Sequence, residues 1–165
     1  EREDDPVILG TKSGFMPPKG RERDPRSWRK EDVLVPILKR KLDAGADRAI
    51  TQFFYSTDAY FRFLDKVLAA GITAPILPGI MPVTNAGQVK RFAEMAGAAF
   101  PEDLAERLVA ASDDPAEVRR IGVEVATELC QELLDAGAPG LHFYTLNRST
   151  ATREIYANLG LPAGA

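Results

Sequence analysis

Apolar and polar residues follow a pattern that repeats along this chain. Three times a helical run ends at a glycine and a short apolar run follows: Gly45 precedes 48–54, Gly71 precedes 75–80, and Gly137 precedes 140–146. Glycine tolerates the left-handed conformation that ends many helices, and each apolar run has the size of a buried strand. The repetition predicts alternating helices and parallel strands.

The segments between the apolar runs carry signals that start helices. Asp114-Pro115-Ala116-Glu117 has the form of a capping box with proline at the first helical position. The apolar residues after it fall on one face at helical spacing. Similar signals are expected to begin three more helices, at Ser56 or Thr57, at Asn85 with Gln88 three residues later, and at Pro101.

The first part of the chain lacks this pattern. Residues 1–32 hold one apolar run, Val7-Ile8-Leu9, which predicts at most one short strand, and are otherwise dense in Pro, Arg, Lys, Asp and Glu. That composition is typical of a solvated linker, with a basic contact surface as the alternative. We therefore expect a charged linker segment over 1–32 and one folded domain over 33–165.

The predicted fold class is α/β, with parallel strands joined by right-handed crossovers. Three strands, or four with Val7-Ile8-Leu9, are too few to close a (β/α)8 barrel, which needs eight strands and about 250 residues. Two architectures remain open: a small open sheet and a partial barrel. No strand is followed by Gly-x-Gly-x-x-Gly, so a dinucleotide-binding fold lacks its motif.

Composition narrows the class of protein further. The 165 residues include 21 basic and 24 acidic side chains, for a net charge of -3, which disfavours nucleic acid as a partner. A single cysteine, Cys130, and a single histidine, His142, predict a reducing compartment and no metal site. No apolar run approaches the ~20 residues that span a bilayer, so we expect a cytoplasmic protein without a membrane partner.

Side chains suited to binding gather at the ends of the predicted strands, where function gathers in parallel α/β folds. The segments are 52–55, 79–85 and 144–148. They offer amide, phenol and guanidinium groups, which bind ligands through hydrogen bonds and charge. None of these groups is a credible nucleophile.

Side-chain alternation along a strand predicts which of these residues share a face. It places Ile50, Gln52 and Phe54 on one face, and His142 with Tyr144 on a common face.

Each candidate also has a purely structural interpretation. Among the polar candidates, Gln52 would satisfy a buried backbone group, Gln88 would complete a capping box, and Arg148 would pair with a local carboxylate such as Glu154. The other three would belong to the core: Phe92 on the apolar face of its helix, His142 as a core histidine, and Cys130 as a small buried hydrophobic residue.

Three motifs in this chain resemble the methylenetetrahydrofolate reductase family. They are Lys39–Asp47 running into Ile50–Phe54, then Pro78–Asn85, then His142–Arg148, and their order and spacing agree with the family as well. The resemblance covers roughly residues 38–161 and corresponds to the sixth, seventh and eighth strands of the family's barrel. The fold it implies is a partial (β/α)8 TIM barrel made of the last three to four β/α units.

The resemblance implies an FAD-dependent oxidoreductase of one-carbon metabolism. In that family NADH or NADPH reduces the flavin, and the flavin then reduces 5,10-methylenetetrahydrofolate to the 5-methyl form. Carried over by motif, Gln52 would bind the pterin or the nicotinamide amide, and Arg148 the folate tail. The other substrate-binding residues implied are Gln88, Phe92 and Tyr144, and the FAD phosphates would be held by Arg40 and Lys41.

This chain also departs from the family pattern. The family's general acid, a glutamate on the first strand, and an aspartate beside the flavin on the fourth strand have no counterpart here, so no catalytic residue is expected in this chain. The family's Tyr-Pro-Glu-x-His-Pro segment is replaced by residues 14–25. We therefore expect a truncated form with little activity on its own.

Two alternatives of a different class stay open. One is a non-catalytic half-barrel that pairs with a separate N-terminal half or with itself, because the edges of a parallel sheet are rarely left bare. The other is a small folate-binding α/β protein without flavin.

Overall fold

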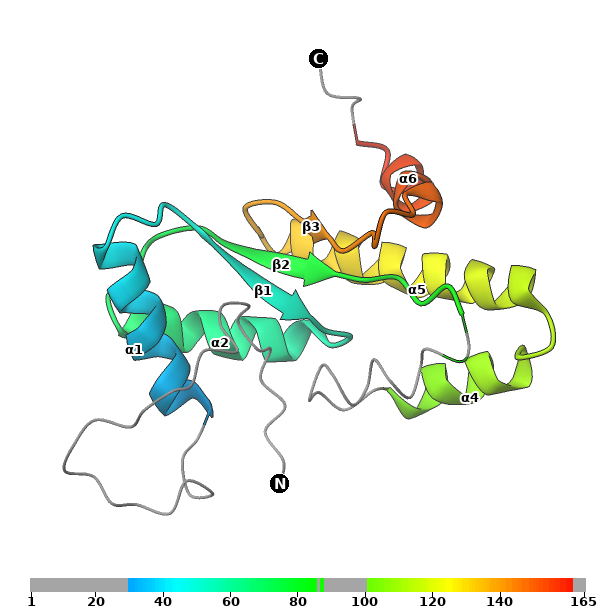
Figure 1. The fold of residues 1–165 in the computed structure, drawn as a ribbon, viewed down its shortest axis with the longest axis horizontal. Coiled ribbons are helices and arrows are strands. Elements are labelled where there is room, and N and C mark those ends of the chain that lie inside the picture. The colour runs from blue at the N-terminus through cyan, green and yellow to red at the C-terminus, as the bar shows by residue number, and fades with distance from the viewer. Residues whose placement is uncertain (1–29, 86, 88–100, 162–165) are drawn as a thin grey trace.

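The computed structural model describes residues 30–85, 87 and 101–161. Strands and helices alternate along them, as the repeating pattern predicts (Figure 1). The elements in chain order are α1 (Lys30–Asp43), β1 (Ala49–Phe53), α2 (Thr57–Ala69), β2 (Ile76–Ile80), α4 (Glu102–Ala110), α5 (Pro115–Asp135), β3 (His142–Phe143) and α6 (Thr150–Asn158).

The three strands of the described residues form one parallel sheet in the order β1-β2-β3. Ala49 lies opposite Ile76 in the first pair, and Gly79 lies opposite His142 in the second. Parallel strands joined through helices confirm the α/β class. An open sheet of this kind is consistent with part of a (β/α)8 barrel.

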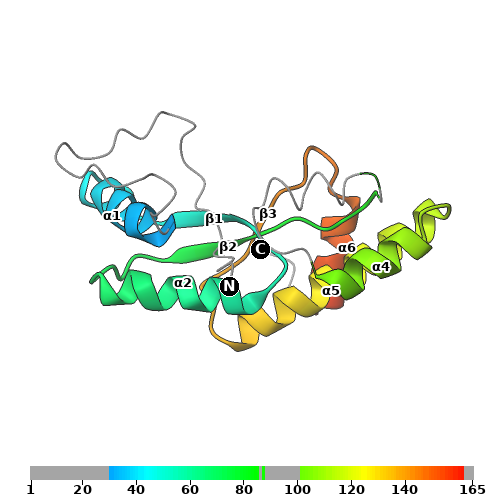
Figure 2. The ribbon, with the colours of Figure 1, turned by 90° about the horizontal axis from the view of Figure 1, so that it is seen from below.

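Helices α2 and α5 cover one face of the sheet (Figure 2). Tyr60 and Phe63 of α2 and Leu133 of α5 are fully buried in one apolar cluster with Ile80 of β2. The Tyr60 hydroxyl donates a hydrogen bond of 2.7 Å to the Ile76 carbonyl, so this buried polar group is satisfied. The main core therefore lies between the sheet and these two helices.

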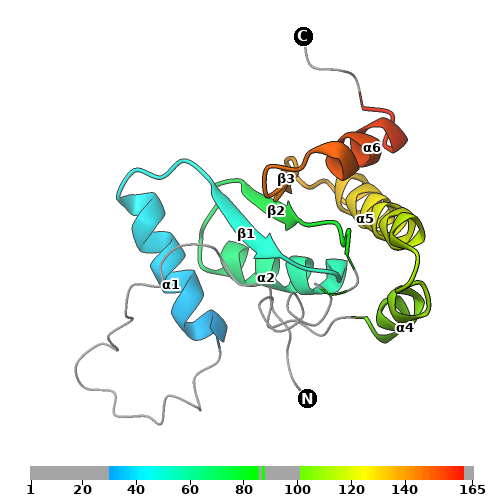
Figure 3. The ribbon, with the colours of Figure 1, turned by 45° about the vertical axis from the view of Figure 1, so that its right-hand side comes forward.

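The remaining helices surround this centre. In Figure 3, α1 stands beside β1, while α6 lies along α5 on the other side of the molecule. A second apolar cluster joins α4 to α5 and to Val83, which follows β2. Helix α5 passes so close to this segment that a Cβ on Gly122 would collide with the Val83 carbonyl. Only glycine fits at that position.

Several local signals are confirmed. The Asp114 side chain accepts hydrogen bonds from the backbone N–H groups of Ala116 at 3.0 Å and Glu117 at 3.2 Å, with proline at the start of α5. Ser56 occupies the position before α2, although its side chain makes no capping hydrogen bond. The glycines that end the three helical runs, Gly45, Gly71 and Gly137, all have positive φ.

The sheet differs from the prediction in two places. The third strand spans only His142–Phe143, because Leu146 and Asn147 adopt positive φ and turn the chain away soon after it. In β1 the pairing register shifts between Ile50 and Phe53.

The register shift in β1 breaks simple alternation. Phe54 stacks on Tyr60 of α2 with ring centroids 5.7 Å apart, while Ile50 lines a cavity with His142 and Tyr144. The prediction that Ile50 and Phe54 share a face is therefore wrong. His142 and Tyr144 do share one, with centroids 4.8 Å apart.

Some predictions fall outside the described residues. These are the short strand at 7–9, most of the linker segment 1–32, and the helix expected from Asn85 with Gln88. Helix α1 begins at Lys30, three residues before the expected start of the folded domain at 33. Among the described residues, no helix combines the length and apolarity that crossing a bilayer requires.

Candidate functional site

The carboxyl ends of β2 and β3 open into a cavity of about 620 Å³, which we call the rim cavity. Tyr144 and Arg148 line it from the segment after β3, and Thr84 and Asn85 line it from the segment after β2. Its volume is in the range of pockets that bind small ligands. The edge of the sheet that the sequence singled out thus carries a cavity.

Tyr144 is held in place by contacts with all three strands. Its hydroxyl donates a hydrogen bond of 2.9 Å to the Thr51 carbonyl in β1, and its ring lies over Gly79 of β2. The ring also meets His142 and Phe53 edge to face, with centroids 4.8 and 6.3 Å away. Burial raises the pKa of Tyr144 above its ordinary value, and the hydroxyl, which is protonated at neutral pH in either case, remains a donor.

A tight turn presents Arg148 at the rim. The Arg148 backbone N–H donates a hydrogen bond of 2.8 Å to the Thr145 carbonyl. Between them Leu146 has a φ of 48° and Asn147 a φ of 63°. Asparagine accepts this left-handed conformation readily, whereas for leucine it is strained. Strain of this kind is often found at functional sites.

Asn85 shapes the segment after β2. Its side-chain Oδ1 accepts a hydrogen bond of 2.8 Å from the Gly87 backbone N–H. This hydrogen bond closes a local turn of a kind that asparagine favours. Its expected partner Gln88 lies outside the described residues, as does Phe92.

A second cavity of about 290 Å³, which we call the α1 cavity, lies between α1 and the sheet. Lys41 lines it with Ile50, His142 and Tyr144. Tyr144 therefore borders both cavities. Arg40 is exposed beside Lys41 in the last turn of α1, which leads into the amino end of β1 rather than its carboxyl end.

The structure brings some of the predicted site residues together and not others. Tyr144 and Arg148 share the rim cavity, and Lys41 reaches the α1 cavity. Gln52 is half-buried in β1 and is not among the residues that line either cavity. The roles of these residues stay predictions.

Glu154 is not the partner of Arg148 that the structural interpretation suggested. It pairs instead with Arg119 of α5, whose Nη2 lies 2.8 Å from Glu154 Oε2. Arg119 also lines the rim cavity, and the sequence analysis missed it. The only sequence feature that pointed to Arg119 is its position beside Arg120 in α5. Adjacent arginines are equally common on solvent-exposed helix faces, so this feature does not indicate a binding site.

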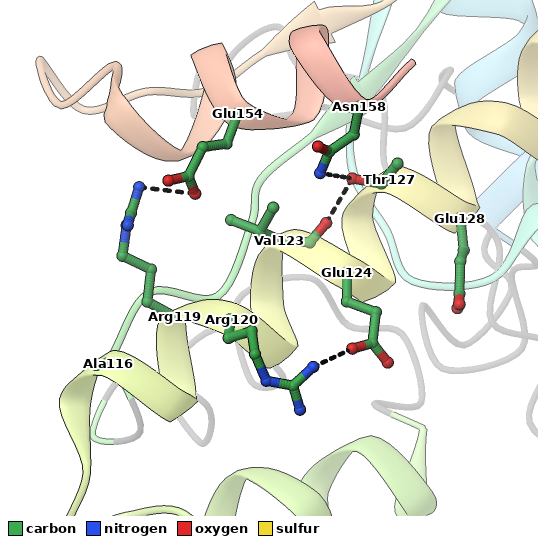
Figure 4. Close-up of a pocket in the computed structure, with 9 residues that line it drawn as sticks. All are labelled: Ala116, Arg119, Arg120, Val123, Glu124, Thr127, Glu128, Glu154 and Asn158. Carbon is green, nitrogen blue, oxygen red and sulfur yellow. Dashed lines mark hydrogen bonds and ion pairs between the residues drawn. The ribbon is translucent and has the colours of Figure 1, made fainter. Parts of the chain in front are cut away.

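A third cavity, of about 650 Å³, lies on the outer side of α5 and α6 (Figure 4). Its charged groups largely satisfy one another: Arg120 pairs with Glu117 at 2.7 Å and with Glu124 at 2.6 Å. The neighbouring Arg107 and Arg120 lower the pKa of Glu124. Because these charges are mutually neutralised, the rim cavity is the better candidate for a ligand site.

Comparison with known proteins identifies relatives. The family model described as methylenetetrahydrofolate reductase matches residues 17–160. The 5,10-methylenetetrahydrofolate reductase of Escherichia coli (strain K12) is 42% identical over 127 residues, covering 77% of this chain and 43% of the relative. Methylenetetrahydrofolate reductase 1 of Schizosaccharomyces pombe is 42% identical over 130 residues, covering 79% of this chain and 22% of the relative.

A plant relative shows the same pattern. Methylenetetrahydrofolate reductase (NADH) 1 of Zea mays is 40% identical over 127 residues, covering 77% of this chain and 21% of the relative. The chain thus spans less than half the length of these curated relatives.

Among solved structures, one similar chain is an uncharacterized protein from Clostridium thermocellum described as binding two copies of 5-methyl-5,6,7,8-tetrahydrofolic acid. It is 19% identical, covers 73% of this chain and 45% of its own, and superposes with a TM-score of 0.47. A likeness this low supports no inference about function.

Proposed function

This chain belongs to the methylenetetrahydrofolate reductase family, and we propose that it supplies a folate-binding part of an FAD-dependent reductase. The reaction would reduce 5,10-methylenetetrahydrofolate to the 5-methyl form with NADH or NADPH. The observation that carries the proposal is that Tyr144 and Arg148, from one family motif, line the same rim cavity at the carboxyl ends of the strands.

The chemistry of these residues fits a folate. The Arg148 guanidinium suits the carboxylates of the folate tail, and the Tyr144 ring offers an aromatic face. The Gln52 amide both donates and accepts hydrogen bonds, as the edge of a pterin requires. Gln88 and Phe92 are proposed as further substrate-binding residues on the basis of the sequence resemblance to the family alone.

The fit to FAD is partial. Lys41 lines the α1 cavity beside His142 and Tyr144, and an ammonium group is well suited to a phosphate. A cavity of about 290 Å³ is at the low end of those that enclose a small ligand. We propose that Lys41 and Arg40 hold the phosphate part of FAD, which supplies the hydride-transfer chemistry when bound.

No proton donor for the reaction is assigned to these 165 residues. In the family the general acid is a glutamate on the first barrel strand, whereas the motifs of this chain resemble the family's last strands. The residues of this chain would bind and orient the folate, while proton donation would come from elsewhere in the complete barrel.

Titration of 5-methyltetrahydrofolate tests the proposal. The wild-type chain is expected to bind it, and Arg148→Met is expected to bind at least about tenfold more weakly, since a charge-assisted contact is worth about 1.5–3 kcal/mol. The control is Arg153→Met, which removes an exposed cation from α6. Absence of binding to the wild type, or equal binding to both variants, would overturn the proposal.

The sheet also favours a second function, as an assembly module. β1 and β3 are the outer strands of the described sheet, and bare edges of a parallel sheet are templates for pairing. We propose that they pair with the remaining strands of the family's barrel, carried on an N-terminal half. Light scattering of the chain, alone and mixed with such a half from a relative, is expected to show a one-to-one complex; two unassociated species would refute pairing.

A further inference from the structure

Apart from tyrosines, Thr51 of β1 is the only buried polar side chain in the described part of the chain, and its exposed fraction is 0%. A hydroxyl without access to water costs free energy unless it is hydrogen-bonded. The Thr51 Oγ1 accepts a hydrogen bond of 2.9 Å from the backbone N–H of Gly79 in the neighbouring strand β2. In a regular parallel pair that N–H would donate to a backbone carbonyl, so a side chain here replaces part of the main-chain ladder.

This hydrogen bond lies at the register shift of β1. Between two pairings with β2, the first strand advances from Ile50 to Phe53. Over the same stretch β2 advances only from Leu77 to Gly79, so β1 carries an extra residue there. Such a β-bulge disrupts the ladder locally and redirects side chains, and bulges are common beside functional sites. The Thr51 hydroxyl supports the bulge, because it satisfies the Gly79 N–H that the disrupted ladder would leave without an acceptor.

The same bulge turns the Thr51 carbonyl out of the plane of the sheet. Its oxygen would lie 2.5 Å from a Cβ added to Gly79, and a Cβ points out of the pleat rather than along the ladder. In this position the oxygen accepts the hydrogen bond of 2.9 Å from the Tyr144 hydroxyl. Thr51 therefore holds β2 with its side chain and the segment after β3 with its carbonyl.

We infer that Thr51 is a positioning residue for the proposed folate site, because its hydroxyl fixes the bulge that aims its own carbonyl at Tyr144. Thr51 is not among the residues that line the rim cavity or the α1 cavity, whereas Tyr144 borders both. The effect of Thr51 on a bound ligand therefore passes through Tyr144. The inference rests on the proposed function and adds to it a residue that lies behind the site.

Two substitutions separate the hydroxyl from the rest of the side chain. Thr51→Val keeps the β-branched shape that suits a strand but leaves the Gly79 N–H without its acceptor. Thr51→Ser keeps the acceptor and loses one methyl group. The matched control is Thr127→Val, which removes a threonine hydroxyl that bonds to the Val123 carbonyl within α5.

The position of Tyr144 is read without any ligand from the ring signals of the ¹³C-tyrosine-labelled chain, assigned with Tyr144→Phe. Thr51→Val is expected to shift the Tyr144 signals, while Thr51→Ser and Thr127→Val leave them close to the wild type. The Tyr60 signals should stay unmoved in all three, because that hydroxyl bonds to the Ile76 carbonyl within the main core. Unmoved Tyr144 signals in Thr51→Val, or equal shifts in the serine variant, would overturn the inference.

A second measurement does not depend on the folding of Thr51→Val. In Tyr144→Phe the bulge should persist, because the Thr51 side chain supports it and the tyrosine hydroxyl does not. Hydrogen exchange of the Gly79 amide is therefore expected to change no more than that of the other β2 amides. A selective loss of protection at Gly79 would show that the bulge depends on Tyr144, which contradicts the inference.

Binding of 5-methyltetrahydrofolate tests whether Thr51 acts through Tyr144. Thr51→Val is expected to weaken binding about threefold or more, within the worth of one hydrogen bond, and Thr51→Ser is expected to restore it. In a Tyr144→Phe background, Thr51→Val is expected to change binding by less than about twofold, because the tether is already lost. Losses that add in the double variant would overturn positioning through Tyr144.

The two proposals fail in different ways. If Thr51→Val displaces the Tyr144 ring while the wild-type chain does not bind 5-methyltetrahydrofolate, the positioning of Tyr144 stands and the folate function fails. If the wild type binds and Thr51→Val binds equally well, the function stands and the role of Thr51 fails.

Discussion

The hydroxyl of Tyr144 donates a 2.9 Å hydrogen bond to the carbonyl of Thr51, 93 positions earlier in the chain. The Tyr144 ring crosses β2 to reach β1, passing over Gly79. A Cβ on Gly79 would lie 2.8 Å from the Tyr144 ring and 2.5 Å from the Thr51 carbonyl oxygen. The segment that carries Arg148 is therefore tied to the first strand through one aromatic side chain.

Tyr144→Phe is expected to lower the free energy of unfolding by about 1 kcal/mol, the usual net worth of one hydrogen bond. Tyr60→Phe removes a shorter bond of 2.7 Å from a fully buried site. It should cost more, because the Ile76 carbonyl would be left unsatisfied without access to water. Urea unfolding measures both, and a larger loss for Tyr144→Phe would contradict this ranking.

Gly122→Ala should destabilise the protein although it improves helix propensity. In an unhindered helix the change stabilises by about 1 kcal/mol. Here the added methyl would collide with the Val83 carbonyl, and overpacking of this kind costs about 1–3 kcal/mol. Thermal unfolding decides the sign, with the exposed Glu128→Ala on the same helix as a near-neutral control. A rise in stability for Gly122→Ala would refute the close approach.

Asp114→Ala should lower the free energy of unfolding by about 1 kcal/mol, because it removes the side chain that caps the amino end of α5. The neighbouring Asp113 is exposed as well and has no part in this cap. Asp113→Ala is thus a matched control for the loss of one negative charge. Urea unfolding of both variants measures the difference, and equal losses would count against the cap.

The sequence predicted the fold wherever a signal is local. The cap at Asp114 and the glycines at 45, 71 and 137 depend only on neighbouring residues, and all appear as expected. The second half of the capping box does not form, because the Glu117 carboxylate pairs with Arg120 while the Asp114 N–H donates to the Ala111 carbonyl. The face of Phe54 was missed because the register shift in β1 arises from pairing with β2, which no local pattern encodes. The short third strand was missed for a different reason, the left-handed turn at Leu146 and Asn147 that follows it.

The candidate site was predictable in part. Tyr144 and Arg148 could be found because they follow a strand within a recognisable motif, and they do line one cavity. Arg119 could not be found, because it lies on a helix far away in sequence and only the packing of α5 beside α6 brings it to the rim. A site residue on a helix lacks the sequence signal that marked Tyr144 and Arg148, namely a position directly after a predicted strand.

Cys130 makes stability depend on pH in the alkaline range. The side chain is fully buried, and burial raises the pKa of its thiol from 9.0 to about 12. Between about pH 9 and pH 12, the thiol therefore keeps its proton in the folded state and loses it in the unfolded state. The contribution of the protonated thiol to the free energy of unfolding is complete below about pH 9. It declines as pH rises toward 12, by at most about 1.4 kcal/mol per pH unit.

Urea unfolding at about pH 7, 8.5 and 10 tests this dependence on Cys130. The free energy of unfolding of the wild type should approach that of Cys130→Ala as pH rises. Tyr60, whose pKa is raised to about 12, titrates alike in both proteins and cancels in the difference. A difference that stays constant with pH would contradict the prediction.

A protein made of these 165 residues should bind a reduced folate without turning it over. Loss of a general acid alone typically costs about 10²–10⁴ in rate, and Lys41 with Arg40 would hold only part of FAD. We expect no flavin absorbance near about 450 nm in the purified protein, a band that would come from the cofactor itself. We also expect no NADH oxidation with 5,10-methylenetetrahydrofolate or with menadione as acceptor. A yellow protein that oxidises NADH with menadione would show that the 165 residues contain a working flavin site. One that does so with 5,10-methylenetetrahydrofolate would show that they contain a working proton donor as well.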